Sequence, residues 1–537
     1  MARIGFPKVA IVALLCACTT AGRSEAQTSG AASLPSISQI VDRHRRAMGR
    51  LPSTSARWSG SIVQDGNKAR FEIVADRDGR YRQTVSYPLA TRSEGSDREV
   101  HWEQDENGDV ETSKPADRFT MSARLVQLNQ YVLGLDDKAS VSEQSIIDGK
   151  SAYPLHATFG GEPITLYVDA ASWLVDGADF KDTSVRYREY RRFSGVAVPS
   201  TIEERRPNSV ITTTIDQVAW GASAREASEI PAQRVPDFPA GRRQVSLRFS
   251  SPRGLIVLQA KLNGQPIKVL LDSASSGSLI DAAAAARLKL ATAGTARVEG
   301  ASLLLGSVAR ADSFDVGGVI FHNFVMDAIP LRLPTSIAGE GIEAVLGYDA
   351  FASLVVRVAY SKGEVGFMAP DSFEYAGNGA VESIDVSDHV PKVAASIGNQ
   401  DRGRFTIDTG SGDNLVLFEP FFASHAKDFD RYLERQDSEA QPVSPSDRYH
   451  PADVKGPDSL LPQTASGAGG EFPVQQASVR NFNLGGISLT EVPAQIILRP
   501  AGAFSPLHSD GLVGGKTLAS FRAVFFDYAR KRFILEP

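Results

Sequence analysis

Residues 404–412 read Arg-Phe-Thr-Ile-Asp-Thr-Gly-Ser-Gly, and the rest of the chain is best understood from this stretch outward. Phe405 and Ile407 alternate with polar neighbours, which is typical of a strand with one buried face. The pattern then breaks at Asp408, where a turn composition begins. A glycine in such a turn lets backbone N–H groups approach the carboxylate. The stretch therefore predicts an acid held at a buried strand-to-turn junction, a geometry suited to general acid–base chemistry.

The same pattern occurs earlier in the chain, at residues 269–277, which read Val-Leu-Leu-Asp-Ser-Ala-Ser-Ser-Gly. A leucine follows seven residues after each acid, as Leu279 in the first copy and Leu415 in the second. The acids themselves, Asp272 and Asp408, are 136 residues apart (408 − 272). One such turn is a weak signal, whereas two with matched surroundings indicate a duplication.

Landmarks downstream of the acids repeat in the same order. Residues 315–320 (Asp-Val-Gly-Gly-Val-Ile) correspond to residues 483–488 (Asn-Leu-Gly-Gly-Ile-Ser), and residues 345–347 correspond to residues 512–514. The double glycines are 168 residues apart (485 − 317), so the second copy carries about 32 additional residues, supplied by the polar stretch 426–470. An internal repeat of this kind predicts two tandem copies of one domain.

On these motifs, residues 244–537 resemble a bilobed aspartic peptidase of the pepsin/retropepsin superfamily. Residues 277–290, which follow the first acid, resemble the short helix of bacterial retropepsin-like domains. The resemblance implies a mainly β fold in which two tandem retropepsin-like β-barrel lobes, residues 244–370 and 380–537, form a pepsin-like unit. We expect the flap hairpins within residues 296–316 and near residues 464–470.

The resemblance also implies a catalytic dyad of Asp272 and Asp408. Two carboxylates within hydrogen-bond reach cannot both ionise cheaply, so the pair shares one proton. The ionised member can take a proton from a water molecule that attacks a peptide carbonyl, while the protonated member donates to the carbonyl oxygen. Such chemistry needs no metal or cofactor.

Supporting roles follow for the three residues after each acid, which are Ser273, Ala274, Ser275, Thr409, Gly410 and Ser411. By resemblance, the hydroxyl of the first residue in each triplet braces the two loops. The second residue offers its N–H group to the carboxylate, and the hydroxyl of the third residue binds the acid. Ala274 departs from the glycine usual in the family. If its backbone required a positive φ, alanine would cost about 1 kcal/mol there.

Bulk properties exclude several classes of function. The chain has 537 residues, 42 % of them hydrophobic, and a formal net charge of −6 without a basic block, so nucleic-acid binding is not indicated. The eight histidines form no metal-ligand spacing, and no cysteine cluster accompanies them. We therefore expect neither a metal nor a cofactor, and we interpret the histidines as surface or core residues.

Residues 1–26 are typical of an export signal. Arg3 and Lys8 precede or flank an apolar run too short to span a membrane, and Ser24-Glu25-Ala26 is a suitable cleavage site. An alternative is a lipobox that ends at Cys18 and leaves a lipid-bearing cysteine. In either case we expect an exported protein of the periplasm or cell envelope.

Residues 34–225 predict a separate β domain. Ser36 should cap a helix that ends at Gly49, strands follow at short intervals, and a second helix is expected near residues 123–133. Residues 164–169 and 190–199 resemble segments of periplasmic lipoprotein carriers, in which an antiparallel sheet curls around a helix. The resemblance implies a module that binds an apolar ligand or peptide; a scaffold for the protease half is the alternative.

Two classes of function remain open. One is an exported aspartic endopeptidase that cleaves peptide or protein substrates; the other is a non-catalytic envelope protein that binds apolar peptides or lipid-modified ligands. A glycosidase is disfavoured, because the repeat makes the acids pseudo-symmetric whereas glycosidases need two different environments. Since one chain carries both lobes, we expect a monomer.

Overall fold

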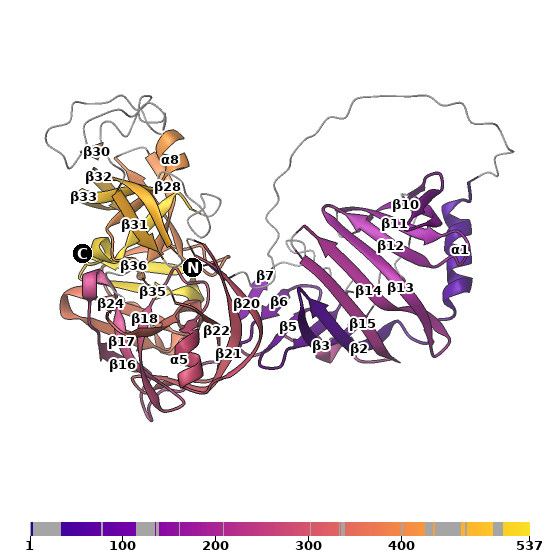
Figure 1. Cartoon of the computed structure of the whole chain (residues 1–537), viewed down its shortest axis with the longest axis horizontal. Coiled ribbons are helices and arrows are strands. Elements are labelled where there is room, and N and C mark those ends of the chain that lie inside the picture. The colour runs from indigo at the N-terminus through magenta and orange to yellow at the C-terminus, as the bar shows by residue number, and fades with distance from the viewer. Residues whose placement is uncertain are drawn as a thin grey trace. The chain divides into compact units, whose positions relative to one another are not determined.

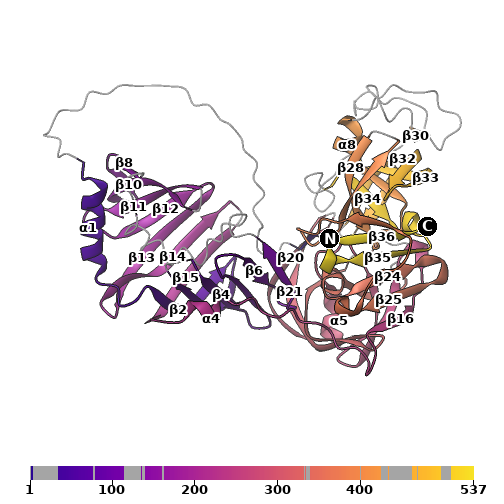
Figure 2. The ribbon, with the colours of Figure 1, turned by 180° about the vertical axis from the view of Figure 1, so that it is seen from behind.

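The computed structural model describes residues 2–3, 34–76, 79–113, 135, 139–159, 162–207, 209–300, 302–331, 333, 339–398, 401–424, 433–434, 463–467, 470–497 and 509–537. The chain forms two compact units, both built mainly of β-strands (Figures 1 and 2). Of the described residues, the N-terminal unit contains those within 34–106 and 110–232, and the two-lobed unit contains 2–3, 107–109 and those within 233–537.

The N-terminal unit is one long antiparallel sheet with a helix against it (Figure 1). Its strands run in the order β7-β6-β5-β4-β3-β2-β15-β14-β13-β12-β11-β10-β8, and β9 pairs with β10. The elements are α1 (Ile37–Met48), β2 (Ser55–Gln64), β3 (Asn67–Asp76), β4 (Tyr81–Ser86), β5 (Thr91–Ser96), β6 (His101–Gln104), β7 (Val110–Ser113), β8 (Ser140–Val141), β9 (Ser145–Ile147), β10 (Lys150–Phe159), β11 (Glu162–Asp169), β12 (Val175–Phe180), β13 (Thr183–Phe193), β14 (Val196–Arg206), β15 (Ser209–Trp220) and α4 (Ala224–Ala227).

Helix α1 begins and ends as its sequence predicts. Ser36 caps it through a capping box with Gln39, and Gly49 follows its last residue. The buried face of the helix includes Ile40 and Met48, and these side chains join a core of strand residues such as Trp58. The apolar stripe of α1 thus covers one face of the sheet.

Two local expectations for this unit fail. The apolar run Trp173-Leu174-Val175 predicts a strand, but Trp173 has a φ of 63° and lies in the turn that precedes β12, which begins only at Val175. Strand β5 was not predicted, because Thr-Arg-Ser-Glu-Gly-Ser carries no alternating apolar residues. The helix expected near residues 123–133 lies outside the described residues, as does the export signal apart from Ala2 and Arg3.

The first lobe of the two-lobed unit contains an eight-stranded sheet in the order β1-β20-β21-β17-β18-β23-β19-β22, and an additional pairing of β21 with β22. Its elements are β1 (Ala2–Arg3), β16 (Gln244–Arg248), η3 (Pro252–Gly254), β17 (Val257–Leu262), β18 (Gln265–Leu271), β19 (Leu279–Asp281), α5 (Ala282–Arg287), β20 (Ala291–Glu299), β21 (Leu303–Val316), β22 (Val319–Ile329), β23 (Ile342–Leu346), α7 (Tyr348–Ser353), β24 (Val355–Ala359), η4 (Tyr360–Lys362), β25 (Glu364–Met368) and η5 (Pro370–Ser372).

The second lobe has a corresponding sheet, β27-β28-β34-β29-β33-β32-β30, in which β27 also pairs with β32 and β31 pairs with β32. Its elements are β26 (Ala380–Ser383), β27 (Lys392–Ile397), β28 (Asp401–Asp408), β29 (Leu415–Phe418), α8 (Glu419–Ser424), β30 (Leu433–Glu434), β31 (Gln463–Gly467), β32 (Gly470–Leu484), β33 (Ile487–Ile497), β34 (Gly511–Gly514), α10 (Gly515–Leu518), β35 (Ala523–Asp527), η9 (Tyr528–Arg530) and β36 (Arg532–Glu536).

The duplication seen in the sequence is also present in the strand pairings. In the first lobe β18 lies parallel to β23 and β19 lies parallel to β22. In the second lobe β28 lies parallel to β34 and β29 lies parallel to β33. Both double-glycine turns have positive φ at each glycine, which is why glycine occupies these hairpins.

A six-stranded sheet, β16-β25-β24-β35-β36-β26, joins the two lobes. Strands β24 and β35 pair antiparallel at its centre, with Val356 opposite Phe526. One continuous apolar core includes Leu271 and Phe351 of the first lobe together with Ile407 and Phe526 of the second. The lobes therefore fold as one packed body.

Among the described residues, no helix has both the length and the apolar character needed to cross a membrane.

Candidate active site

Each acid of the repeat lies at the end of a buried strand. Asp272 follows the last residue of β18, and Asp408 is the last residue of β28. Apolar residues such as Leu271 and Ile407 are fully buried and fix the strands in the lobe cores. Parallel pairing with β23 and β34 supports both strands from one side, and the Asp272 N–H donates to the Leu346 carbonyl over 3.0 Å.

The two turns make the same contact with their own acids. The Ala274 N–H donates to Asp272 Oδ1 over 2.9 Å, and the Gly410 N–H donates to Asp408 Oδ1, also over 2.9 Å. Hydrogen bonds from backbone N–H groups favour the ionised carboxyl and hold its orientation. Both carboxyl groups are thus positioned by the backbone rather than by mobile side chains.

Ser273 and Thr409 join the two turns through four reciprocal hydrogen bonds. The Ser273 N–H donates to Thr409 Oγ1 (2.9 Å), and the Thr409 N–H donates to Ser273 Oγ (3.1 Å). Ser273 Oγ donates to the Ile407 carbonyl (2.7 Å), and Thr409 Oγ1 donates to the Leu271 carbonyl (2.9 Å). Both side chains are completely buried. All four hydrogen bonds join one lobe to the other, so together they fix one acid-bearing turn against the other.

The Asp272 carboxylate lies directly against the opposite turn. A Cβ placed on Gly410 would lie 2.5 Å from Asp272 Oδ2 and 2.6 Å from Oδ1, far inside van der Waals contact. Gly410 has no positive φ, so glycine is needed here for close approach and not for backbone conformation. The two acid-bearing turns therefore face each other, and each acid lies beside the other lobe.

The electrostatics of Asp408 agree with this proximity. Burial raises the pKa of the Asp408 carboxyl above its ordinary value, and the neighbouring Asp272 carboxylate raises it further. The N–H groups of Gly410 and Ser411 oppose the rise because they stabilise the ionised form. Asp272 is 6 % exposed. The raised pKa means that Asp408 keeps its proton at a pH at which an exposed aspartate has lost it.

The outer serines of the triplets have different partners from those that the resemblance implies. Ser275 Oγ donates to the Gly277 carbonyl over 2.7 Å, and Ser411 Oγ accepts from the Asp413 N–H over 3.3 Å. These contacts hold the turn backbone rather than the acid. It is the backbone of Ser411, and not its hydroxyl, that acts on Asp408. Both serines therefore shape the turns from which the acids project.

Ala274 carries no backbone strain. It is not among the described residues with positive φ, so the cost considered for alanine at this position does not arise. Its side chain is half-buried. Although Ala274 replaces the glycine usual in the family, its N–H group donates to Asp272 just as the Gly410 N–H group donates to Asp408.

A pair of tyrosines was missed in the sequence. Tyr360 follows β24 and Tyr528 follows β35, the two central strands of the shared sheet. Both hydroxyls are enclosed and have no hydrogen-bond partner in the described part of the chain. Burial raises the pKa of each tyrosine; Asp408 adds to the effect at Tyr360, and Asp272 adds to it at Tyr528. Each tyrosine therefore lies near the acid of the other lobe.

The signal that could have revealed them is the repeat itself. The tyrosines are 168 residues apart (528 − 360), the same separation as the double glycines. A short, mostly apolar run precedes each tyrosine, so each one resembles the ordinary end of a buried strand. Only the tertiary structure, in which β24 pairs with β35 across the lobes, brings Tyr360 close enough to Asp408 and Tyr528 close enough to Asp272 to be affected by their charge.

Hairpins occur where flaps were expected. In the first lobe β20 and β21 pair antiparallel and enclose residues 300–302, and in the second lobe β31 pairs with β32. Two side chains near the start of β21, Leu303 and Leu305, are 50 % and 56 % exposed. They give the first hairpin an exposed apolar surface.

Comparison with known families supports the resemblance for the first lobe. The model of a family described as aspartyl protease matches residues 258–350, a segment that contains Asp272 and ends within α7. The match does not include Asp408. No curated protein matches the chain.

Three solved structures illustrate the range of similarity. A retropepsin-like aspartic protease from Rickettsia conorii is 12 % identical and has a TM-score of 0.18, with 29 % of this chain and 89 % of that chain covered. Basic 7S globulin from soybean is 12 % identical with a TM-score of 0.31, covering 55 % and 96 %. A LolA superfamily protein from Nitrosomonas europaea is 12 % identical with a TM-score of 0.28, covering 36 % and 98 %.

Proposed function

We propose that the protein is an exported aspartic endopeptidase in which Asp272 and Asp408 share one proton. The observation that carries the proposal is the reciprocal clamp of Ser273 and Thr409, which holds two buried acids on facing turns. A clamp of four buried hydrogen bonds is far more than a surface turn requires. It supplies the preorganisation that a two-acid mechanism needs.

The chemistry follows from the different charge states of the acids. The raised pKa of Asp408 favours its protonated form, which leaves Asp272 to act as the base toward a water molecule between them. The water oxygen forms a bond to the peptide carbonyl carbon as its proton passes to Asp272, and Asp408 donates its proton to the carbonyl oxygen. Asp272 then passes its proton to the leaving nitrogen as the C–N bond breaks, and a hydroxyl group of the tetrahedral intermediate gives its proton to Asp408 as the new carboxyl group forms. The reaction consumes one water and returns the pair to its single-proton state.

The exposed leucines of the first hairpin fit a peptide substrate. An extended chain that binds beside Leu303 and Leu305 could cover their apolar surface. We therefore propose that the enzyme prefers substrates with apolar side chains next to the cleaved bond. The substrate class that we propose is therefore an unfolded or extended peptide segment with apolar residues.

Export is proposed from residues 1–26 alone. Either cleavage after Ala26 or lipidation at Cys18 would place the mature protein in the periplasm or cell envelope. Mass spectrometry of the mature N-terminus separates these outcomes, because a diacylated Cys18 and a free Gln27 differ greatly in mass. We further propose that the N-terminal unit binds an apolar ligand or the substrate chain, and that the protein acts as a monomer.

A second function, a non-catalytic binding protein, draws on one observation, the alanine at position 274. An added methyl group beside facing acid turns could narrow the space for the attacking water. The same fold would then bind apolar peptides without cleaving them.

The decisive experiment measures cleavage of casein and of a peptide library between pH 3 and pH 7, with and without pepstatin. We expect the wild-type protein to cleave, and Asp272→Asn and Asp408→Asn each to lose at least about 100-fold in rate. The matched control is Asp315→Asn. It changes an aspartate near the end of β21, in a hairpin that is distant in sequence from both acid-bearing turns. Cleavage that survives equally in both dyad variants would overturn the proposal, whereas peptide binding without cleavage would favour the second function.

A further inference from the structure

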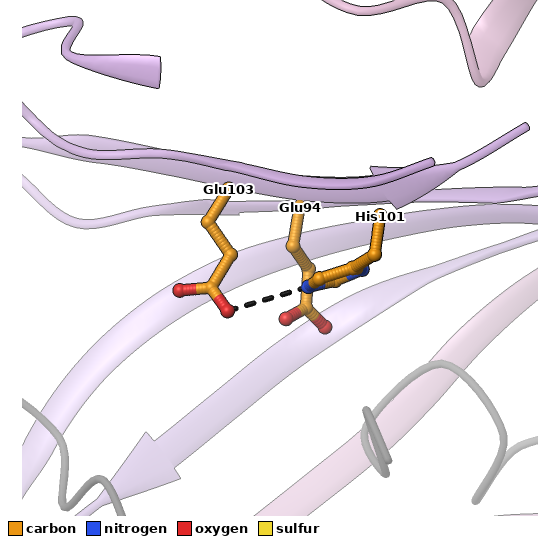
Figure 3. A group of neighbouring side chains, drawn as sticks. All are labelled: Glu94, His101 and Glu103. Carbon is orange, nitrogen blue, oxygen red and sulfur yellow. Dashed lines mark hydrogen bonds and ion pairs between the residues drawn. The ribbon is translucent and has the colours of Figure 1, made fainter. Parts of the chain in front are cut away.

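Two neighbouring strands at one end of the N-terminal sheet carry a polar cluster, composed of Glu94, His101 and Glu103, that the proposed peptidase function does not use. Glu94 lies on β5, and His101 and Glu103 lie on β6. Glu94 is directly opposite Glu103 in the antiparallel register, and Ser96 is opposite His101. Residues two apart on a strand share a face, so all three side chains project from the same side of the sheet. Figure 3 shows both carboxylates turned toward the ring of His101.

The ligand atoms of the cluster converge. One atom each from Glu94, His101 and Glu103 lies within 4.8 Å of the other two. His101 Nε2 and Glu103 Oε1 are 3.3 Å apart, whereas a hydrogen bond between a charged imidazole and a carboxylate is about 2.7–2.9 Å long. The edge of a tetrahedral Zn²⁺ site is roughly 3.3–3.6 Å, given Zn–N and Zn–O bonds of about 2.0–2.2 Å. The observed separation fits two ligands of one ion.

His101 is held in an orientation that suits a ligand. It is 2 % exposed, and its Nδ1 lies 3.2 Å from the hydroxyl of Tyr81 on the neighbouring strand β4. If Nδ1 carries the proton and donates to the Tyr81 oxygen, the lone pair of Nε2 faces the two carboxylates. Metal-binding histidines are commonly fixed in this way by a partner on the other ring nitrogen.

Gln83 supplies an independent indication. It is 8 % exposed, and its Oε1 is buried without a hydrogen-bond partner in the described part of the chain. Gln83 is directly opposite Glu94 in the pairing of β4 with β5, so the Cβ atoms of these two residues are about 4.5–5.5 Å apart on one face of the sheet. A buried amide oxygen without a donor costs about 1–3 kcal/mol, unless a cation or donor completes the site.

We propose that Glu94, His101 and Glu103 form a binding site for a divalent transition-metal ion, with Gln83 Oε1 completing the coordination. One imidazole and two carboxylates are a donor set suited to Zn²⁺, and hard oxygen ligands alone would instead suit Mg²⁺ or Ca²⁺. The histidine therefore points to Zn²⁺ or a close relative. The site belongs to the sheet of the N-terminal unit and is independent of the acid pair.

The sequence could not show this arrangement. Glu94 and His101 are separated by a turn, and the metal-ligand spacing that is sought along one helix or loop does not apply to ligands on paired strands. For His101 the proposal differs from the expectation that no histidine takes part in a metal site.

The test is a titration of the full mature chain, produced without a polyhistidine tag and freed of metal by chelation. Zn²⁺ is the probe for calorimetry, and Co²⁺ is the probe for visible absorption, which reports a tetrahedral site. We expect one ion per chain, with affinity lowered at least 100-fold in His101→Ala and in the isosteric Glu94→Gln. Tyr81→Phe should lower it about 10-fold to 100-fold, because it removes only the support of the histidine.

Two controls make the outcome decisive. His156→Ala removes an exposed histidine of the same sheet and should leave binding unchanged. Far-ultraviolet circular dichroism shows whether each variant keeps its strands, and Glu94→Gln tests the site even if His101→Ala fails to fold. The proposal is overturned if Zn²⁺ and Co²⁺ show no saturable binding, if Glu94→Gln and His101→Ala bind as the wild type does, or if only Ca²⁺ or Mg²⁺ binds. Zn²⁺ binding that persists in the double variant Asp272→Asn/Asp408→Asn shows that the metal site is distinct from the proposed peptidase site.

Discussion

Gly410 and the carboxylate of Asp272 occupy adjoining space across the two lobes, so that Gly410 has no room for a side chain. Each belongs to a turn at the end of a buried strand, and the contact joins parts of the chain that are 138 residues apart (410 − 272). Several consequences of this relationship can be measured.

Gly410→Ala should damage both stability and activity. The new methyl group would overlap the Asp272 carboxylate, and overpacking of this kind costs about 1–3 kcal/mol. A displaced acid should also reduce cleavage by about 100-fold. Thermal unfolding and peptide assays measure these effects, with Gly339→Ala as a control because a Cβ there meets no atom within 4 Å. Equal behaviour of the two variants would contradict the facing arrangement.

Ala274→Gly should have a much smaller effect. The Ala274 backbone has no positive φ, so glycine relieves no strain and lowers stability by about 0.4–1 kcal/mol through greater freedom of the unfolded chain. Cleavage should continue at a comparable rate. A rate that rises tenfold or more would instead show that the methyl group obstructs the site, and an activity that first appears in this variant would favour the binding-protein function.

Thr409→Val should destabilise the protein by about 2–4 kcal/mol. Valine keeps the shape of threonine but leaves the buried Ser273 N–H without its acceptor and the Leu271 carbonyl without its donor. Urea denaturation measures the loss. Thr409→Ser keeps the hydroxyl and should retain most of the stability, so similar losses in both variants would indicate that packing, and not the clamp, is responsible.

The stability of the wild-type protein should fall as the pH rises through the pKa of Asp408. The folded-state pKa of this group is raised by burial and by Asp272, so between the unfolded and folded values the folded chain holds more protons than the unfolded chain. The contribution of Asp408 to the free energy of unfolding is therefore fully present below the pKa of the unfolded state, and it is lost as the pH rises through the pKa of the folded state.

Asp408→Asn removes that titration and serves as the test. We expect its melting temperature to exceed that of the wild type by roughly 2–4 °C at pH 7, for a gain of about 1 kcal/mol, and the difference to vanish near pH 3. Asp281→Asn, at the cap of α5, provides a carboxyl control and should instead lose stability, because Oδ1 accepts from the Ala283 N–H and Oδ2 accepts from the Leu331 N–H, and an amide NH2 group can replace only one of the two oxygens. A wild-type protein that is stabilised by rising pH, relative to Asp408→Asn, would disprove the raised pKa.

Tyr528→Phe should leave stability unchanged or raise it by up to about 1 kcal/mol. The hydroxyl is buried and unpartnered in the described part of the chain, so its removal ends a desolvation cost without breaking a contact. The Tyr528 ring stacks on Phe351 with the ring centroids 5.6 Å apart, and phenylalanine keeps this contact. A loss above 1 kcal/mol would show that the hydroxyl is bonded in solution, and a shifted pH profile of cleavage would connect it to the acid pair.

The sequence by itself determined the local structures whose signals lie within a few residues. The capping box of Ser36 forms as expected, because it depends on neighbouring backbone groups. The repeat also identified Asp272 and Asp408, since strand alternation, turn residues and a matched order of landmarks are properties of the chain alone.

Only the tertiary structure decided which groups meet. The partners of Ser275 and Ser411, the place of Tyr360 and Tyr528, and the contact of Gly410 with Asp272 depend on how two lobes share one sheet. The convergence of polar side chains from β4, β5 and β6 depends likewise on register between strands, and β5 is too polar to be recognised as a strand. Burial, close approach and shifted pKa values arise between residues distant in sequence, so they follow from packing and not from local pattern.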